Sequence, residues 1–219
     1  MTTIRAVLFD VIGTTVLEED PDFVNRCFRY AFSANNVRVT EENILRVRGK
    51  DKLEAIHALL VEVGEPLILS NKIFAEFERS ITSGIANFRE HPQLKEVVGV
   101  LKRRSIAVGV GSGLPRSVFK VLFEHLQWRK YDFDFIEVFE TYAVGRPAPA
   151  MIHDMCDKLQ LLPGQLLKVG DTMSDIEEGK NAKTQTAAIL SGTQPADLLM
   201  SAKPDYIFTS LNDILQALR

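Results

Sequence analysis

Five polar side chains follow apolar segments of the chain or stand in the loops between them. They are Asp10, Ser112, Arg146, Asp171 and Asp175. Carboxylates that a fold brings together repel one another unless a cation joins them. Carboxylate oxygens and a backbone carbonyl suit Mg²⁺, which usually keeps several waters and completes its shell with a substrate phosphate. This combination of residue types therefore predicts a metal-dependent site for a phosphoryl group.

The other groups of the set fit the same chemistry. Arg146 offers a fixed positive charge, and Ser112 and Gly113 offer a hydroxyl and backbone N–H groups at an expected helix start, where anions bind. Asp10 is then placed to attack the phosphorus covalently. A single aspartate at a strand end is more often a turn former or a helix cap. The matching groups in three later segments favour the site over that alternative.

These residues must be positioned by the strands and helices around them. The alternation of apolar and amphipathic segments along the chain predicts an α/β fold with a parallel, doubly wound sheet. Short apolar runs indicate strands at residues 4–9, 106–110, 135–139, 166–169, 186–190 and 206–208, and amphipathic segments between them indicate helices. We expect Ser174 to cap the helix that follows Asp171. In such sheets ligands bind just outside the carboxyl ends of the strands. Residues 1–16 and 87–219 are the predicted core.

Residues 17–86 show helical periodicity and no strand signal. Apolar residues recur at three- and four-residue steps from Phe23 onward, Thr40 is placed to cap a second helix, and Asp51 to open a third. A fourth helix is expected around Phe77. An all-helical segment inserted directly behind the first strand predicts a cap domain that lies over the strand ends.

The amino-acid composition restricts the kinds of partner that the protein can bind. The 219 residues are 46% hydrophobic and 25% charged with a net charge of −3, which is ordinary for a globular protein and gives no basic field for nucleic acid or anionic membranes. No apolar stretch reaches the roughly 18 residues that would span a membrane. The two cysteines lack metal-ligand spacing and suit a reducing compartment. With a first strand that starts at once, we expect a cytoplasmic protein without a signal peptide.

In its motifs the sequence resembles the haloacid-dehalogenase-like hydrolase superfamily. The four motifs occur in order at Asp10 to Thr14, at Ser112, at Arg146 and at Gly170-Asp171-Thr172 with Asp175. The resemblance implies a Rossmann-like core with an inserted cap and a nucleophilic aspartate, followed in the motif by the catalytic Thr14. It also implies a Mg²⁺ ion held by Asp10, the carbonyl of Ile12, Asp171 and Asp175.

Departures from the superfamily pattern indicate a subgroup. Most of its phosphatases carry a second aspartate two residues after the first, whereas this chain has Ile12, which cannot transfer a proton. Haloacid dehalogenases and phosphonatases both lack that acid, but dehalogenases use no metal and have no need of the acids at 171 and 175. Phosphonatases read Gly-Thr-Thr and Gly-Arg-Pro, as residues 13–15 and 145–147 do here. The chain therefore resembles the phosphonatase group.

The helical segment adds a further resemblance. Phosphonoacetaldehyde hydrolases form a Schiff base between a cap lysine and their aldehyde substrate, and Lys52, shortly after Gly49, occupies that position. The resemblance implies that both residues bind substrate and that Lys52 is catalytic, with a pKa lowered by burial or by neighbouring cations. Arg48 and Ala55 depart from the family pattern. The alternative interpretation of Lys52 is a solvated lysine in the first turn of a helix.

Three functions remain open at this point. The first is a capped, Mg²⁺-dependent hydrolase of a small phosphonate or phosphate monoester that works through an aspartyl-phosphate. The second is a general small-molecule phosphatase, and the third is a catalytically weak binding or regulatory relative. The resemblance also implies a homodimer formed through the cap.

Overall fold

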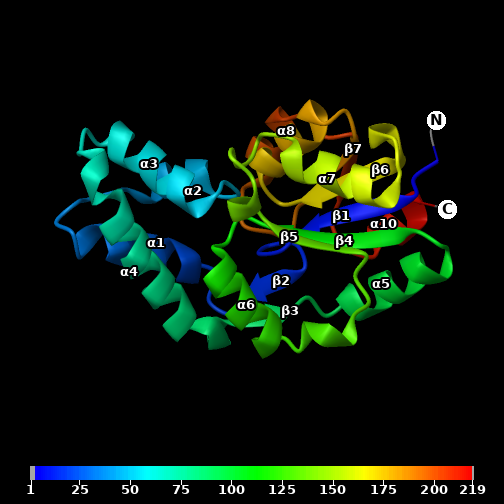
Figure 1. Ribbon diagram of the computed structural model, residues 1–219, viewed down its shortest axis with the longest axis horizontal. Helices are drawn as coiled ribbons and strands as arrows, with labels where there is room; N and C mark the ends of the chain where they lie inside the picture. Colours follow the sequence, from blue (N-terminus) through cyan, green and yellow to red (C-terminus); the bar gives the residue numbers. More distant parts are fainter. Residues whose placement is uncertain (1–2, 219) are drawn as a thin grey trace.

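The computed structural model describes residues 3–218 and contains a six-stranded parallel sheet in the order β5-β4-β1-β6-β7-β8 (Figure 1). The strands are β1 (Ala6–Asp10), β4 (Ala107–Ser112), β5 (Phe135–Val138), β6 (Leu166–Gly170), β7 (Gln185–Ile189) and β8 (Tyr206–Phe208). The predicted α/β class and the doubly wound parallel sheet are confirmed.

The central strand β1 is buried along its whole length, as its continuous apolar sequence predicts. It pairs with β4 on one side and β6 on the other, so that Phe9 lies opposite both Val110 and Val169. The chain runs outward from β4 to β5 and then crosses over to β6. The carboxyl end of β1, with Asp10, therefore lies at the point where the winding direction reverses, and such points form ligand crevices.

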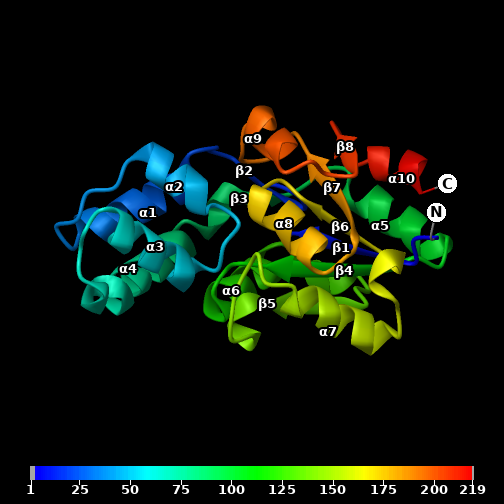
Figure 2. The same ribbon diagram turned by 90° about the horizontal axis from the view of Figure 1, so that it is seen from above.

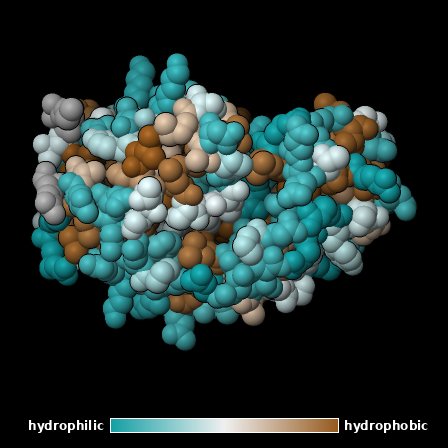
Figure 3. Space-filling view, turned by 180° about the vertical axis from the view of Figure 1, so that it is seen from behind, coloured by the Kyte–Doolittle hydropathy of each residue, from teal (hydrophilic) through white to brown (hydrophobic). Residues whose placement is uncertain are grey.

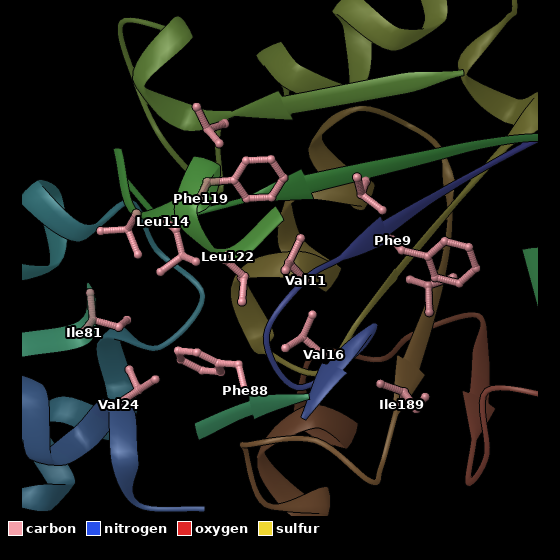
Figure 4. Packing of buried hydrophobic residues seen from close by; sticks show 14 of the residues in the cluster. Phe9, Val11, Val16, Val24, Ile81, Phe88, Leu114, Phe119, Leu122 and Ile189 are labelled. Atoms are coloured by element: carbon pink, nitrogen blue, oxygen red, sulfur yellow. The ribbon is translucent and has the colours of Figure 1, made fainter. Parts of the chain in front are cut away.

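Helices cover both faces of the sheet (Figures 1 and 2). They are α5 (Leu94–Arg103), α6 (Arg116–His125), α7 (Ala150–Leu159), α8 (Met173–Asn181), α9 (Ala196–Ser201) and α10 (Asp213–Ala217). Side chains of β1 alternate between the two faces. Val7 and Phe9 join the core cluster that includes α5 and α6, part of which Figure 4 shows. Leu8 joins the cluster of α7, which contains Met155.

Four helices project from one end of the sheet (Figures 1 and 2). They are α1 (Phe23–Ser33), α2 (Glu41–Val47), α3 (Lys52–Glu62) and α4 (Ser70–Ser83), which match the helices expected in this segment. Helices α1 and α4 pack through Phe28 and Phe77, whose ring centroids are 4.5 Å apart. Thr40 caps α2 through the N–H of Asn43, and Asp51 caps α3. The division into a core and a cap with the stated boundaries stays a prediction.

Two short strands were not predicted from the sequence. Strands β2 (Val16–Glu18) and β3 (Phe88–Glu90) form an antiparallel pair at the two ends of the helical segment. Three residues are too few to show a period of two, so no pattern could indicate them. Short 3₁₀ helices lie at Leu67–Leu69 (η1), Ile85–Asn87 (η2), Trp128–Lys130 (η3), Phe139–Thr141 (η4) and Pro163–Gln165 (η5).

The expected cap of α8 was wrong by two positions. Thr172, rather than Ser174, caps this helix, and Ser174 lies within its first turn. The Thr172 hydroxyl accepts from the N–H of Asp175, and the Asp175 carboxylate accepts from the N–H of Thr172. This reciprocal pair satisfies two backbone donors and fixes the earlier start.

The surface is largely hydrophilic, with apolar residues scattered over the face shown in Figure 3. Within residues 3–218, none of the helices combines the length and the apolar character needed to cross a membrane.

Candidate active site

Asp10 lies at the carboxyl end of β1 and lines a cavity beneath the α2–α3 connection. Its Oδ1 accepts a hydrogen bond of 2.5 Å from Nη1 of Arg146, while Oδ2 has no hydrogen bond from any described residue. Burial raises the pKa of Asp10, as does the nearby Asp175 carboxylate, and Arg146 only partly offsets this. One carboxylate oxygen is thus held in place while the other is left for chemistry.

Arg146 is held on every side. Its Nη1 lies 2.9 Å from Oδ1 of Asp175, its Nη2 donates to the carbonyl of Gly111 at 2.9 Å, and its Nε donates to Oε2 of Glu178 at 3.0 Å. Its guanidinium also lies over the ring of Phe139. Burial alone would lower the pKa of Arg146, but the surrounding carboxylates, Asp175 foremost, raise it overall. Arg146 is therefore a fixed cation in a fixed orientation.

Asp171 is enclosed by two loops. Its Oδ1 accepts from the hydroxyl of Thr14 at 3.1 Å, and its Oδ2 accepts from both the N–H and the hydroxyl of Thr193. Gly13 has φ +96°, and a Cβ there would lie 2.1 Å from Asp171 Oδ2, so only glycine fits. Burial, followed by the charges of Asp10 and Asp175, raises the pKa of Asp171 to about 7.

A divalent cation fits this group of charges. Oxygen atoms of Asp10, Asp171 and Asp175 lie within 4.8 Å of one another. The buried charged side chains around them are Asp10, Asp171, Asp175, Glu178, Arg146 and Lys168. These four carboxylates outnumber the two cations, and Lys52, which lines the same cavity, is a third buried cation nearby. Burial is the largest cause of the raised pKa values of Asp10, Asp171 and Glu178, and neighbouring carboxylates add to it. A divalent ion with oxygen ligands, such as Mg²⁺, would offset the excess of carboxylates.

Lys52 lies in the first turn of α3, and only 7% of its surface is exposed. Its Nζ donates to the carbonyl of Lys50 at 3.0 Å, and it lines the same cavity as Asp10. Burial, with help from the positive charge of Arg48, lowers the pKa of Lys52 to about 8. The alternative interpretation of a solvated lysine is therefore wrong.

Ser112, Gly113 and Ile12 line the same cavity. Ser112 ends β4 and is 2% exposed, and its hydroxyl oxygen accepts from the N–H of Leu114 at 3.1 Å. Helix α6 begins shortly afterwards, at Arg116. The structure thus brings together the site residues that the sequence had placed on separate segments.

The helical segment lies closed upon the core. A Cβ at Gly49, which has φ +85°, would come within 2.1 Å of Oγ1 of Thr172, and a Cβ at Gly113 would come within 2.6 Å of the carbonyl oxygen of Lys50. The cavity between them measures about 30 Å³. That is room for about one or two water molecules. The helical segment and the core thus leave little free space around Asp10.

Several buried residues of the site were missed in the sequence analysis. Lys168 contacts Asp175 at 3.0 Å and Glu178 at 3.3 Å, and its position inside an apolar strand run was a usable signal. Glu18, which forms a buried ion pair of 2.7 Å with Arg48, was also missed, whereas Arg48 itself was already noted beside Lys52. Thr193, whose contacts with Asp171 are described above, follows β7 in a Ser-Gly-Thr loop that carries no sequence signal of a role.

Comparison with known proteins places the chain in a family. The family model described as haloacid dehalogenase-like hydrolase matches residues 7–189. The chain belongs to this family. It is an enzyme of the hydrolase class, and the resemblance seen in its motifs is confirmed.

Relatives bear several names. The chain is 26% identical to pyrophosphatase PpaX of Oceanobacillus iheyensis over 97% of its own length and 96% of the relative's. It is 28% identical to phosphonoacetaldehyde hydrolase of Lactiplantibacillus plantarum over 87% of its length and 77% of the relative's. A phosphonoacetaldehyde hydrolase-like protein from Oleispira antarctica has the same fold, with a TM-score of 0.87 and 19% identity, over 99% of this chain and 92% of that one.

Proposed function

We propose that this protein is a Mg²⁺-dependent hydrolase that cleaves a small phosphonate or phosphate monoester through an aspartyl-phosphate, in the manner of a phosphonoacetaldehyde hydrolase. The observation that carries the proposal is the position of Lys52. A buried lysine with a pKa lowered to about 8 lines the same cavity as Asp10, Ser112 and Gly113. A phosphatase that used Asp10 alone would have no need of a buried amine there.

Asp10 acts as the nucleophile in this proposal. Its free Oδ2 attacks the phosphorus, while Arg146 holds Oδ1 and turns the carboxylate toward the cavity. Ser112 and the amide of Gly113, which line the same cavity, bind the phosphoryl oxygens. Thr14 holds Asp171 in place through its hydroxyl.

The metal site of the proposal comprises Asp10, Asp171 and Asp175 with the carbonyl of Ile12. When bound, Mg²⁺ would neutralise charge on the phosphoryl oxygens and on the carboxylates around it. The excess of buried carboxylates over buried cations in the site supports such an ion, and we propose that the ion is Mg²⁺.

Lys52 supplies the electron sink for C–P cleavage. Its neutral amine condenses with the substrate aldehyde to an imine and releases water. When Asp10 forms its bond to phosphorus, the electron pair of the C–P bond moves onto carbon and is taken up by the protonated imine, which becomes an enamine. Protonation and hydrolysis of the enamine return the lysine and release an aldehyde, and water then hydrolyses the aspartyl-phosphate to phosphate. No carboxylic acid is needed at Ile12.

A simple phosphatase is the second candidate. The match to pyrophosphatase PpaX over nearly the whole chain favours it. Water or a cap residue would then have to protonate the leaving group, because Ile12 cannot. The third possibility, a catalytically weak binding or regulatory relative, is disfavoured because the assembled charges around Asp10 would have no use in it.

One assay separates these functions. The protein is incubated with phosphonoacetaldehyde, with a panel of small phosphate monoesters and with pyrophosphate, each in the presence of Mg²⁺ and in the presence of excess chelator. Release of phosphate and acetaldehyde from the phosphonate alone supports the first candidate, whereas release of phosphate from esters or pyrophosphate alone supports the second. No turnover of any compound would support the regulatory relative.

The remaining expectations belong to the same proposal. They are a core of residues 1–16 and 87–219, a cap of residues 17–86, a homodimer formed through the cap, and a cytoplasmic location. Light scattering on the purified protein tests whether it is a dimer. If the dimer forms through the helical segment, a charged residue in place of the exposed Ile68 should weaken it.

A further inference from the structure

The first turn of α3 is attached to the loop that carries Arg146. The N–H of Gly145 donates a hydrogen bond of 2.7 Å to Oε1 of Glu54, across 91 positions of sequence. Glu54 is half-buried and forms no ion pair with any other described residue. A carboxylate that has a backbone amide rather than a cation as its partner makes a short, directional, charge-assisted bond.

The contact is close enough to require a glycine. A Cβ at Gly145 would lie 2.7 Å from Cβ of Asp51 and 2.9 Å from Oε2 of Glu54. The backbone before Arg146 thus lies directly against the α3 turn. A second and weaker contact joins the same two segments, because Nη1 of Arg146 lies 3.4 Å from the carbonyl of Gly49.

Lys52 stands between these two points of attachment. Gly49 lies three residues before it and Glu54 two residues after it, and both contact the 145–146 segment. Lys52 itself contacts only its own segment through the carbonyl of Lys50 among the hydrogen bonds of the described residues. Its position in the cavity that Asp10 also lines therefore depends on how the segment around it is attached to the core.

We infer that Glu54 is a positioning residue, which sets the amine of Lys52 against Asp10 by joining α3 to the amide of Gly145. The inference rests on the proposed function insofar as it assigns a purpose to Lys52. Arg146 has further partners in Asp10, Asp175, Glu178 and Gly111, so loss of the Glu54 contact leaves its guanidinium in place. The segment that moves is the one that carries Lys52.

Two variants test this. Glu54→Ala removes the acceptor, whereas Glu54→Gln keeps an amide oxygen that can accept from Gly145. Glu65→Gln is the matched control, because Glu65 is an exposed carboxylate beyond the far end of α3. Circular dichroism melts establish that each variant is folded at the assay temperature.

The first measurement needs no catalysis. Reductive methylation with formaldehyde and borohydride, followed by mass spectrometry, gives the modification rate of each lysine. We expect Lys52 to react at least fivefold faster in Glu54→Ala than in wild type, while the exposed Lys95 reacts equally in both. Glu54→Gln and Glu65→Gln should stay within twofold of wild type at Lys52.

The second measurement is turnover. Because a misplacement of about 1 Å can cost on the order of 100-fold in rate, we expect kcat for phosphonoacetaldehyde to fall about 10- to 100-fold in Glu54→Ala, with a smaller change in KM. Hydrolysis of a phosphate monoester should fall less, and Glu54→Gln should recover most of the loss.

The outcomes separate this inference from the proposed function. If wild type fails to cleave phosphonoacetaldehyde, the proposed function fails, and the methylation rates still decide the role of Glu54. An unchanged methylation rate of Lys52 in Glu54→Ala would overturn the inference. It would also be overturned if Glu54→Gln behaved like Glu54→Ala, since the acceptor would then be irrelevant.

Discussion

The hydroxyl of Thr14 lies 3.1 Å from Oδ1 of Asp171, to which it donates a hydrogen bond across 157 positions of sequence. This bond joins the loop after β1 to the end of β6 and fixes one carboxylate of the proposed metal site. Both residues are completely buried. Their separation in sequence means that the bond forms only when the central strands of the sheet have paired.

Thr14→Val removes that donor and keeps the shape. We expect a loss of about 1–3 kcal/mol in the free energy of unfolding, because a buried carboxylate oxygen loses its partner. Urea unfolding at neutral pH measures it. The matched control is Thr209→Val, whose hydroxyl bonds Asp213 at the same distance of 3.1 Å on the surface. That control should change stability by less than about 0.5 kcal/mol, and equal effects in the two variants would contradict the prediction.

Asp10→Asn tests the nucleophile. The amide keeps the size of the side chain but lacks the attacking charge, so aspartyl-phosphate formation and turnover should stop. Single acid–base groups typically contribute about 10²–10⁴-fold, so the loss should exceed about 100-fold. Phosphate release under saturating substrate measures it. A smaller loss would show that another group attacks phosphorus.

Removal of Mg²⁺ should abolish turnover, and its addition should stabilise the fold. A ligand at 100 times its Kd adds about 2.7 kcal/mol to the stability of the native state. The pKa of Asp171 is about 7, so its carboxylate ionises as the pH rises through that value. We therefore expect the increase in Tm caused by Mg²⁺ to be larger at pH 8 than at pH 6. Full activity in excess chelator would refute the metal requirement.

Lys52→Arg keeps the positive charge but cannot form an imine. Cleavage of phosphonoacetaldehyde should vanish in this variant, while hydrolysis of phosphate monoesters survives. Borohydride added to wild type with phosphonoacetaldehyde should trap an adduct on Lys52, which mass spectrometry of the digested protein detects. Persistence of both activities in Lys52→Arg would make the lysine a binding charge and the protein a simple phosphatase.

The pH dependence of phosphonoacetaldehyde cleavage also follows from Lys52. Only the neutral amine condenses with an aldehyde, and the lowered pKa of Lys52 is about 8. Cleavage of phosphonoacetaldehyde should therefore increase as the pH rises from 7 to 9, with a midpoint near 8. Phosphate ester hydrolysis needs no neutral amine and should lack this transition. The two profiles measured on one preparation serve as controls for each other, and identical profiles would contradict a role for the neutral lysine.

The site residues that stand at the carboxyl ends of strands could be predicted from the sequence. Asp10, Ser112 and Asp171 each follow an apolar run, and parallel strands bring their carboxyl ends to one edge. The ion pair of Arg48 with Glu18 had no such signal, because it depends on how the helical segment closes on the core. Thr172 and Ser174 are both good helix caps by type. Only the hydrogen bond from the N–H of Thr172 to the Asp175 carboxylate decides between them.

The insertion of the helical segment behind β1 has a consequence for folding. Ala6 in the central strand pairs with Ala107 on one side and Leu166 on the other, so β1 has no partner until about half of the chain is present and lacks its second partner until β6 follows. Helices α1 to α4 contact one another within Phe23–Ser83, which precedes β4, and can form earlier. During synthesis we therefore expect the helical segment to be compact first, with β1 left unpaired beside it, and aggregation at this stage to be the main hazard of producing the protein.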